Sequence, residues 1–194
     1  MSMNKDFILP IVTLSLICLF VSGALAIVNN YTDPVIKNAA AERAANARKK
    51  IIPQADGFAL LTSEEFPKTI TEAYRATNDT GFVFIISVQG YGGEIKLICG
   101  IDNDGKIIRT AFLSHTETKG MTDPVFAEPH PSEPTFQGQF IGKDKSLNGI
   151  IAVTGATISS NAYRNGIRDA FAAFHIVNNA EQIEQTEQEE NINE

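Results

Sequence analysis

The hydrophobic and polar positions divide the chain into distinct blocks. After a short N-terminal segment (residues 1–6), residues 7–28 form an uncharged apolar run, long enough to cross a hydrocarbon core of about 30 Å as a helix. Alanine and other small apolar residues then recur at helical spacing, after Thr32-Asp33-Pro34, which is typical of a helix start. The pattern predicts a transmembrane anchor over 7–28 and a separate stalk helix within 29–52.

The middle of the chain predicts a sheet. Residues 82–88, 94–100 and 106–113 are three consecutive β-strand patterns, and Asn103-Asp104-Gly105 between the last two is typical of a hairpin turn. A helical pattern over 161–177 follows. The fold class is therefore α+β: an anchor and a stalk helix, then one mainly antiparallel-sheet domain over 53–179 with a C-terminal helix.

Charge is concentrated at the C-terminus. The net charge is −7, and residues 180–194 contain six glutamates and neither lysine nor arginine. This composition predicts a disordered, solvated tail. The chain lacks a basic patch with interleaved aromatic residues, which argues against nucleic-acid binding.

The apolar run has a second interpretation. Lys5 and Ala24-Leu25-Ala26 are also features of a cleaved signal peptide, but the run continues through Val28 and exceeds the usual signal-peptide core, which favours an uncleaved anchor. Basic residues after the span place the domain in the cytoplasm by the positive-inside rule, yet long domains are translocated with little regard to charge. Charge therefore does not decide the side of the membrane.

Conventional catalytic and metal-binding patterns are missing from the sequence. Cys18 lies in the apolar run and Cys99 in a predicted strand, so no intrachain disulfide is expected and no Cys/His metal spacing is present. His115 and Glu117 are residue types that serve as base and orienter, but no Cys nucleophile flanks them and no metal-ligand partner has suitable spacing. We predict a binding loop here, with neither catalytic residues nor a metal site.

Residues 154–160 combine hydroxyl side chains with Gly155 and Ala156. Small residues let the backbone approach a bulky group and leave the next hydroxyl, that of Thr157, unshielded. The segment precedes the predicted C-terminal helix, and helix N-termini bind phosphate through free N–H groups and the helix dipole. The pattern suits a phosphate attached to Thr157; a simple helix N-cap is the alternative interpretation.

Four of these elements together resemble a known family, in order and in spacing. They are the anchor ending in Val28-Asn29-Asn30-Tyr31-Thr32, the turn Gly90-Tyr91-Gly92-Gly93, the loop His115-Thr116-Glu117-Thr118, and Thr154-Gly155-Ala156-Thr157. Over nearly its whole length the chain resembles the G subunit of Rnf electron-transport complexes, which is similar to the C subunit of the sodium-translocating NADH:quinone reductase.

The resemblance implies a covalent flavin, FMN joined through its phosphate to Thr157 as a phosphoester. The remaining residues that it places at the flavin are Thr154, Gly155, Ala156, Ser159, Ser160, His115, Glu117 and Thr118. It further implies an electron relay without its own substrate, other membrane redox subunits as partners, and a flavin transferase that uses FAD and magnesium. The flavin domain is expected outside the cytoplasmic membrane, on a single-pass anchor.

Two positions depart from the family pattern. Ile151 occupies the place of the usual aspartate three residues before Thr154, and Lys119 that of the usual proline. If the aspartate helps the transferase, flavin attachment is less efficient here. The alternative functions are a membrane-tethered binding or assembly module without cofactor, and a flavoprotein reductase with another acceptor.

Overall fold

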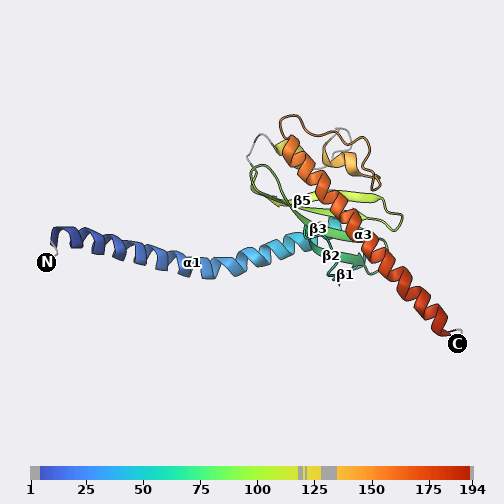
Figure 1. Cartoon of the computed structure of the whole chain (residues 1–194), viewed down its shortest axis with the longest axis horizontal. Helices are drawn as coiled ribbons and strands as arrows, with labels where there is room; N and C mark the ends of the chain where they lie inside the picture. The colour runs from blue at the N-terminus through green and yellow to red at the C-terminus, as the bar shows by residue number, and fades with distance from the viewer. Residues whose placement is uncertain (1–4, 118–119, 121, 128–134, 193–194) are drawn as a thin grey trace. The chain divides into compact units, whose positions relative to one another are not determined.

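The computed structural model describes residues 5–117, 120, 122–127 and 135–192. The chain forms two compact units, Met1–Ala44 and Ala45–Glu194. The first consists of most of helix α1 (Lys5–Ile51), and the second contains the sheet and helix α3 (Thr157–Ile192). Figure 1 shows these elements in chain order.

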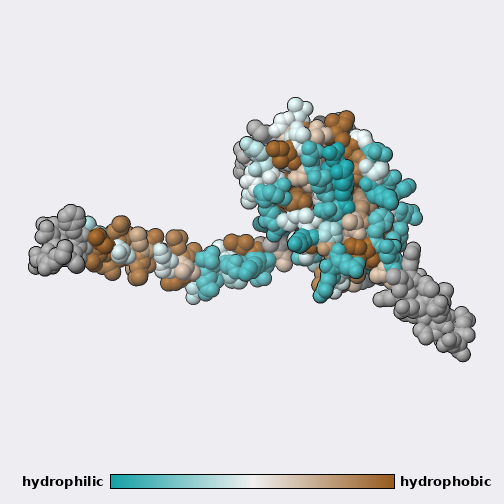
Figure 2. Space-filling view, in the orientation of Figure 1, coloured by the Kyte–Doolittle hydropathy of each residue, from teal (hydrophilic) through white to brown (hydrophobic). Residues whose placement is uncertain are grey.

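Helix α1 has an apolar first part and a polar second part. Figure 2 shows hydrophobic side chains along the first part, and Leu19, Phe20 and their large apolar neighbours are exposed. In the described part of the chain, α1 is the one helix that is long and apolar enough to cross a membrane. The predicted apolar N-terminal helix is therefore confirmed by length and composition.

The predicted helix start at Thr32-Asp33-Pro34 is wrong. Helix α1 runs uninterrupted through this segment and contains Pro34 in its interior. Strong helix formers follow the proline, chiefly alanine, and favour helix on that side. An ion pair between Asp33 and Lys37, 2.6 Å long, links successive turns across the same segment. A capping pattern with proline is thus compatible with an interior position when both flanks favour helix.

The sheet is a five-stranded antiparallel meander in the order β1-β2-β3-β4-β5. Its strands are β1 (Phe58–Leu61), β2 (Ile70–Ala76), β3 (Phe82–Gln89), β4 (Glu94–Ile101) and β5 (Ile107–His115). The three predicted strands are confirmed to within two residues at each end. The predicted hairpin turn is confirmed too, because Gly105 has φ +73° and donates its N–H to the Asp102 carbonyl over 3.1 Å.

Helix α3 crosses one face of the sheet and packs mainly on β3 and β4 (Figure 1). Phe174 of α3 meets Phe82 of β3 edge to face, with ring centroids 5.4 Å apart. A Cβ at Gly166 would lie 3.0 Å from Val88, so glycine allows the helix to approach the strand. These contacts hold α3 against the sheet and so position the 154–160 segment at its N-terminal end.

The opposite face of the sheet receives the C-terminal end of α1. Ile51 and Ile52 are fully buried, and a Cβ at Gly100 of β4 would overlap the Ile51 side chain. Arg48, one turn earlier, lies over the Tyr74 ring of β2. The end of α1 is therefore part of the hydrophobic packing of the sheet domain.

Helix α3 is longer than the sequence predicted at both ends. It begins at Thr157, four residues before the expected start, and its backbone remains helical to Ile192, where the composition predicted a disordered tail from residue 180. Glutamate, glutamine and alanine are good helix formers, so an acidic segment that follows a packed helix can continue it.

Candidate cofactor site at the start of helix α3

The segment before α3 is held by backbone hydrogen bonds that lead into the helix. Ala156 N–H donates to the Val153 carbonyl over 3.0 Å, and Ser160 N–H donates to the Ala156 carbonyl over 2.9 Å. Gly155 has φ +81°, a conformation that glycine adopts without steric cost. The predicted position of the motif at a helix N-terminus is confirmed.

The four hydroxyl residues of the segment lie in different environments. Thr154 and Thr157 are exposed, and neither makes a side-chain hydrogen bond to another described residue. Ser160 is buried, and its hydroxyl accepts the Val153 N–H over 3.1 Å. Ser159 is 1% exposed, and its hydroxyl has no partner among the described residues.

These environments separate accessible hydroxyls from internal ones. A modifying enzyme can reach Thr154 and Thr157 without disturbing the fold, whereas Ser160 supports the loop. The Thr157 side chain makes no N-cap bond to the described part of the chain, so the capping interpretation does not account for this residue.

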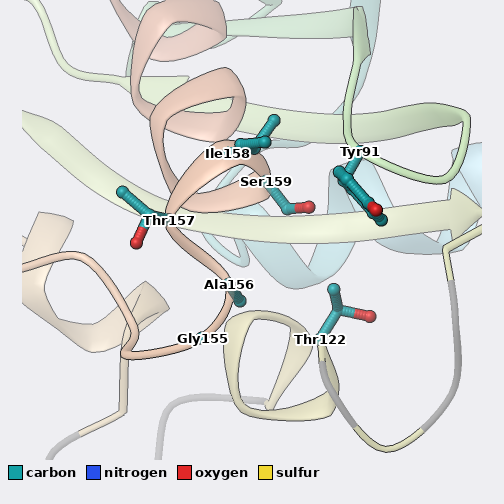
Figure 3. Close-up of a pocket in the computed structure, with 7 residues that line it drawn as sticks. All are labelled: Tyr91, Thr122, Gly155, Ala156, Thr157, Ile158 and Ser159. Carbon is teal, nitrogen blue, oxygen red and sulfur yellow. The ribbon is translucent and has the colours of Figure 1, made fainter.

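A cavity of about 380 Å³ lies against the first turn of α3. Its lining residues are Tyr91, Thr122, Gly155, Ala156, Thr157, Ile158 and Ser159. Figure 3 shows Tyr91 facing the Ser159 hydroxyl from a separate loop, while the Thr157 side chain points to the other side of the helix start. Among the described residues the lining is apolar apart from hydroxyl groups and backbone, and none of these lining side chains is charged.

The Gly90-Tyr91-Gly92-Gly93 turn is fixed by Glu117. Gly92 N–H donates to Glu117 Oε2 over 3.1 Å, and Gly90 N–H closes the turn on the Gly93 carbonyl over 2.8 Å. A Cβ at Gly90 would overlap Glu117 Oε1, so this close contact requires glycine. Glu117 thus holds Tyr91 at the cavity without lining the cavity itself.

His115 supports the same loop from the other side. Its Nδ1 accepts the Glu117 N–H over 3.2 Å, and its ring stacks on Phe126 with centroids 4.1 Å apart. His115 is therefore packed among aromatic side chains and does not line the cavity. Thr118 and Lys119, the next predicted positions, lie outside the described residues.

Ile151, the departure from the family pattern, is held through its backbone. Gln139 Oε1 accepts the Ile151 N–H over 2.8 Å, and Gln139 Nε2 donates to the Ile151 carbonyl over 3.1 Å. The Ile151 side chain is 73% exposed. A side chain of another type at position 151 is consequently compatible with this backbone geometry.

Sequence reasoning missed three residues of the cavity, Tyr91, Thr122 and Ile158, as site residues. Tyr91 was recognised only as part of a turn; an aromatic residue between glycines, where it cannot enter the core, was the available signal.

Comparison with known proteins agrees with this geometry. Residues 90–172 match the FMN-binding domain family, a range that begins at the Tyr91 turn and includes the start of α3. The chain is 30% identical to the G subunit of a proton-translocating ferredoxin:NAD(+) oxidoreductase complex of Clostridium ljungdahlii, over 78% of this chain and 83% of the relative. It is 32% identical to the G subunit of an ion-translocating oxidoreductase complex of Methanosarcina acetivorans, over 88% and 95%.

Proposed function

Because the chain belongs to the family of G subunits of Rnf-type ion-translocating oxidoreductase complexes, we propose that it is a membrane-anchored electron-transfer flavoprotein subunit carrying FMN as a phosphoester on Thr157. The apolar part of α1 serves as the anchor in the cytoplasmic membrane, with the flavin domain on the extracytoplasmic side. Its partners are the other redox subunits of such a complex.

The Thr157 hydroxyl is the observation that carries this proposal. It is exposed, makes no hydrogen bond to a described residue, and stands on the first residue of α3 inside the range that matches the FMN-binding domain. The N–H groups of the first helical turn have no carbonyl acceptor within the helix. They form the positive end of the helix dipole, which favours a bound phosphate. A phosphodiester on Thr157 keeps one negative charge for these groups.

The attachment reaction is a transfer of FMN from FAD by a separate flavin transferase. The Thr157 oxygen forms a bond to the FMN phosphorus, the pyrophosphate bond of FAD breaks, and AMP leaves with the bonding electron pair. The hydroxyl proton is lost. Exposure of Thr157 meets the need of the transferase for an accessible acceptor, and the small residues Gly155 and Ala156 leave the approach open.

When bound, FMN supplies the electron-transfer chemistry, and the protein supplies position and electrostatics. The chain's own contribution is to keep the cofactor at one place on the domain and the domain at the membrane. A covalent cofactor cannot dissociate, and anchoring raises its effective concentration near membrane partners. Neither role needs a catalytic acid, base or metal ligand in the chain.

The first experiment is the intact mass of the full-length chain, co-expressed with an active flavin transferase. We expect a gain of one FMN less one water, complete loss of this gain in Thr157→Ala, and its retention in Thr154→Ala, the matched control on the other exposed hydroxyl. Both variants should keep the wild-type circular dichroism spectrum.

Three other outcomes would bear on the proposal. If Thr157→Ala kept the added mass and Thr154→Ala lost it, the acceptor would be Thr154. If the wild type were unmodified but Ile151→Asp gained the mass, the acceptor would stand and the missing aspartate would explain poor transfer. An unmodified mass in both, with the transferase active on another protein, would favour an assembly module without cofactor.

A further inference from the structure

Two short segments of the chain have the sequence Asn-x-Ser/Thr, in which x is not proline. They are Asn30-Tyr31-Thr32 in helix α1 and Asn78-Asp79-Thr80 in the turn between β2 and β3. This sequence is the acceptor for N-linked glycosylation, a modification of surface loops in proteins that leave the cytoplasm. Because so short a sequence also arises by chance, its structural setting decides which copy can serve.

The β2–β3 turn presents the Asn78 side chain to solvent. Ala76 N–H donates to the Gly81 carbonyl over 2.9 Å, and Asp79 N–H donates to the Ala76 carbonyl over 3.0 Å, which closes the hairpin. Asp79 has φ +59°, a left-handed conformation that asparagine and aspartate adopt more readily than other non-glycine residues. Asn78 is exposed at this turn, so a bulky group added to its side chain displaces none of the core.

The amide and the hydroxyl of the second segment are paired in the fold. The Thr80 hydroxyl donates to Asn78 Oδ1 over 2.8 Å, and Asn78 Nδ2 donates to the Gln54 carbonyl. The side-chain amide has two N–H groups, so one hydrogen can be replaced by a sugar while the other keeps the bond to Gln54. The two groups that a glycan transferase must recognise together therefore lie side by side on an exposed turn.

Asn30 has a less suitable setting. It lies in the uninterrupted helix α1, two residues after the apolar run 7–28. Residues i and i+2 of an α-helix are about 200° apart and project to different sides, so Thr32 cannot pair with Asn30 as Thr80 pairs with Asn78. Both the helical backbone and the adjacent membrane span disfavour Asn30 as an acceptor.

We propose that Asn78 is an N-glycosylation site, so that the domain carries a sugar chain on the β2–β3 turn. The inference rests on the extracytoplasmic placement in the proposed function, and it adds a second covalent modification. The donor is a glycan linked to a polyprenyl phosphate or pyrophosphate, and a membrane-bound oligosaccharyltransferase catalyses the transfer. Asn78 Nδ2 forms a bond to the anomeric carbon of the first sugar, and the bond between that carbon and the carrier phosphate oxygen breaks. The phosphate leaves with the electron pair, and Nδ2 loses one proton.

The sugar would stand at the end of the sheet opposite to the cofactor site. In an antiparallel meander the β2–β3 and β4–β5 turns share one end, and the β3–β4 turn lies at the other. Accordingly, Asn103 of the β4–β5 turn donates to the Asp79 carbonyl over 2.7 Å, whereas the β3–β4 turn brings Tyr91 to the start of α3. A glycan on Asn78 leaves Thr157 accessible to the flavin transferase. It also places a hydrophilic group beside β1, an edge strand of the kind that otherwise pairs with other chains.

The test uses the full-length protein purified from the membranes of the organism that makes it, with the gene replaced by each variant in turn. One tryptic digest separates the three sites. Peptide 76–96 contains Asn78, peptide 6–37 contains Asn30, and peptide 146–164 contains Thr157. We expect peptide 76–96 of the wild type to carry an added mass that releases sugar ions on fragmentation.

Four variants identify the acceptor. Asn78→Gln and Thr80→Val should lose the added mass completely, whereas Thr80→Ser should keep it because serine retains the hydroxyl. Thr80→Val leaves Asn78 and its bond to Gln54 in place and nearly preserves side-chain size, so it should fold, which circular dichroism verifies. Asn30→Gln, the matched amide control, should leave peptide 76–96 glycosylated.

Protease added to spheroplasts measures the side of the membrane, because it digests a domain that faces outward. An unmodified peptide 76–96 in an outward-facing domain would overturn the glycosylation site, and FMN on peptide 146–164 would leave the proposed function intact. Sugar on peptide 6–37 instead would overturn the choice of Asn78. A domain protected from protease would overturn the extracytoplasmic placement and this inference with it. Sugar on peptide 76–96 without FMN on peptide 146–164 would support this inference and overturn covalent flavin attachment.

Discussion

Helix α3 borders two cavities of nearly equal size, and their polar groups differ. One, about 380 Å³, is the cavity at its first turn. The other, about 360 Å³, lies between the Asn103-Asp104-Gly105 turn, residues 144–146 and the Phe174 region of the helix. We refer to them as the first-turn cavity and the hairpin cavity.

In the hairpin cavity, the Asn103 and Asp144 side chains already bind other groups of the protein. Asp144 accepts hydrogen bonds from the backbone N–H and the hydroxyl of Ser146, and the Asn103 amide donates to the Asp79 carbonyl over 2.7 Å. The first-turn cavity instead contains the buried Ser159 hydroxyl, which has no partner among the described residues. Volume alone therefore does not separate a surface hollow from a ligand site; unsatisfied polar groups do.

The largest effect is expected from Gly90→Ala, which disturbs the contact with Glu117 that holds the Tyr91 turn at the first-turn cavity. The new methyl group would overlap Glu117 Oε1 and Ile95 Cδ1, and the Tyr91 turn must shift. We expect a loss of about 1–3 kcal/mol in the free energy of unfolding, the range typical of overpacking, together with greater iodide access to the attached flavin. Urea unfolding and fluorescence quenching measure the two effects.

Gly105→Ala is the matched change at the hairpin cavity. Gly105 has φ +73°, so alanine should cost roughly 1–2 kcal/mol through backbone strain. The flavin should be unaffected, because the strain lies at the other cavity. Equal effects of the two variants on iodide access would contradict the distinction between the cavities.

The sequence predicted some elements of the molecule and left others out. Apolar runs predicted β3, β4 and β5 because buried central strands have continuous hydrophobic patterns. No prediction covered β1 or β2, since β1 has only four residues and β2 mixes Glu72 and Arg75 with alanines, a composition without strand periodicity. Thr157 was identified by local chemistry, and its place on the first residue of α3 agrees with that prediction.

The cavity itself could not be predicted from the sequence. Tyr91 and Ser159 are far apart in the chain, and they face the same space only because α3 packs across β3 and β4. The contact between Gly90 and Glu117 likewise depends on the register of β4 and β5, which places His115 opposite Ile95. The predicted break at Pro34 failed for a related reason, because a local capping pattern does not report the helix propensity of both flanks.

A smaller effect is expected from Gln139→Ala, which releases the backbone of Ile151 ahead of the attachment segment. Two hydrogen bonds are lost, but water can replace both at this exposed position, so we expect about 1 kcal/mol of destabilisation. The rate of FMN transfer should fall because Thr157 is presented by a looser loop. Transfer rates are followed by mass, with Gln139→Glu as the partner variant that keeps the acceptor for Ile151 N–H.

An unchanged transfer rate in Gln139→Ala would mean that Gln139 does not help to present the acceptor. Destabilisation comparable to that of Gly90→Ala would mean that this exposed pair matters as much as the buried support of the Tyr91 turn. Either result would shift the emphasis from the cavity to the loop that precedes it.

The smallest effect is expected at the hairpin cavity, where stability should depend on pH. Hydrogen bonds from the Ser146 hydroxyl and N–H hold the pKa of Asp144 below its usual value. A carboxyl with a depressed folded-state pKa contributes stability above its unfolded pKa, about 3.9, and this contribution is lost as the pH falls through the folded-state value. The difference in unfolding free energy between wild type and Ser146→Ala should therefore be present at neutral pH and shrink in acid.

Urea unfolding of the two proteins at neutral pH and in acid measures that difference, and their comparison cancels the other carboxyl groups. Flavin absorption and iodide access should be the same in both proteins at each pH, because the Asp144 pair is complete without a ligand. A difference that grew in acid would show that the Ser146 hydroxyl stabilises the protonated carboxyl. A change in the flavin signal would show that the two cavities are coupled through α3 and that their polar groups do not act independently.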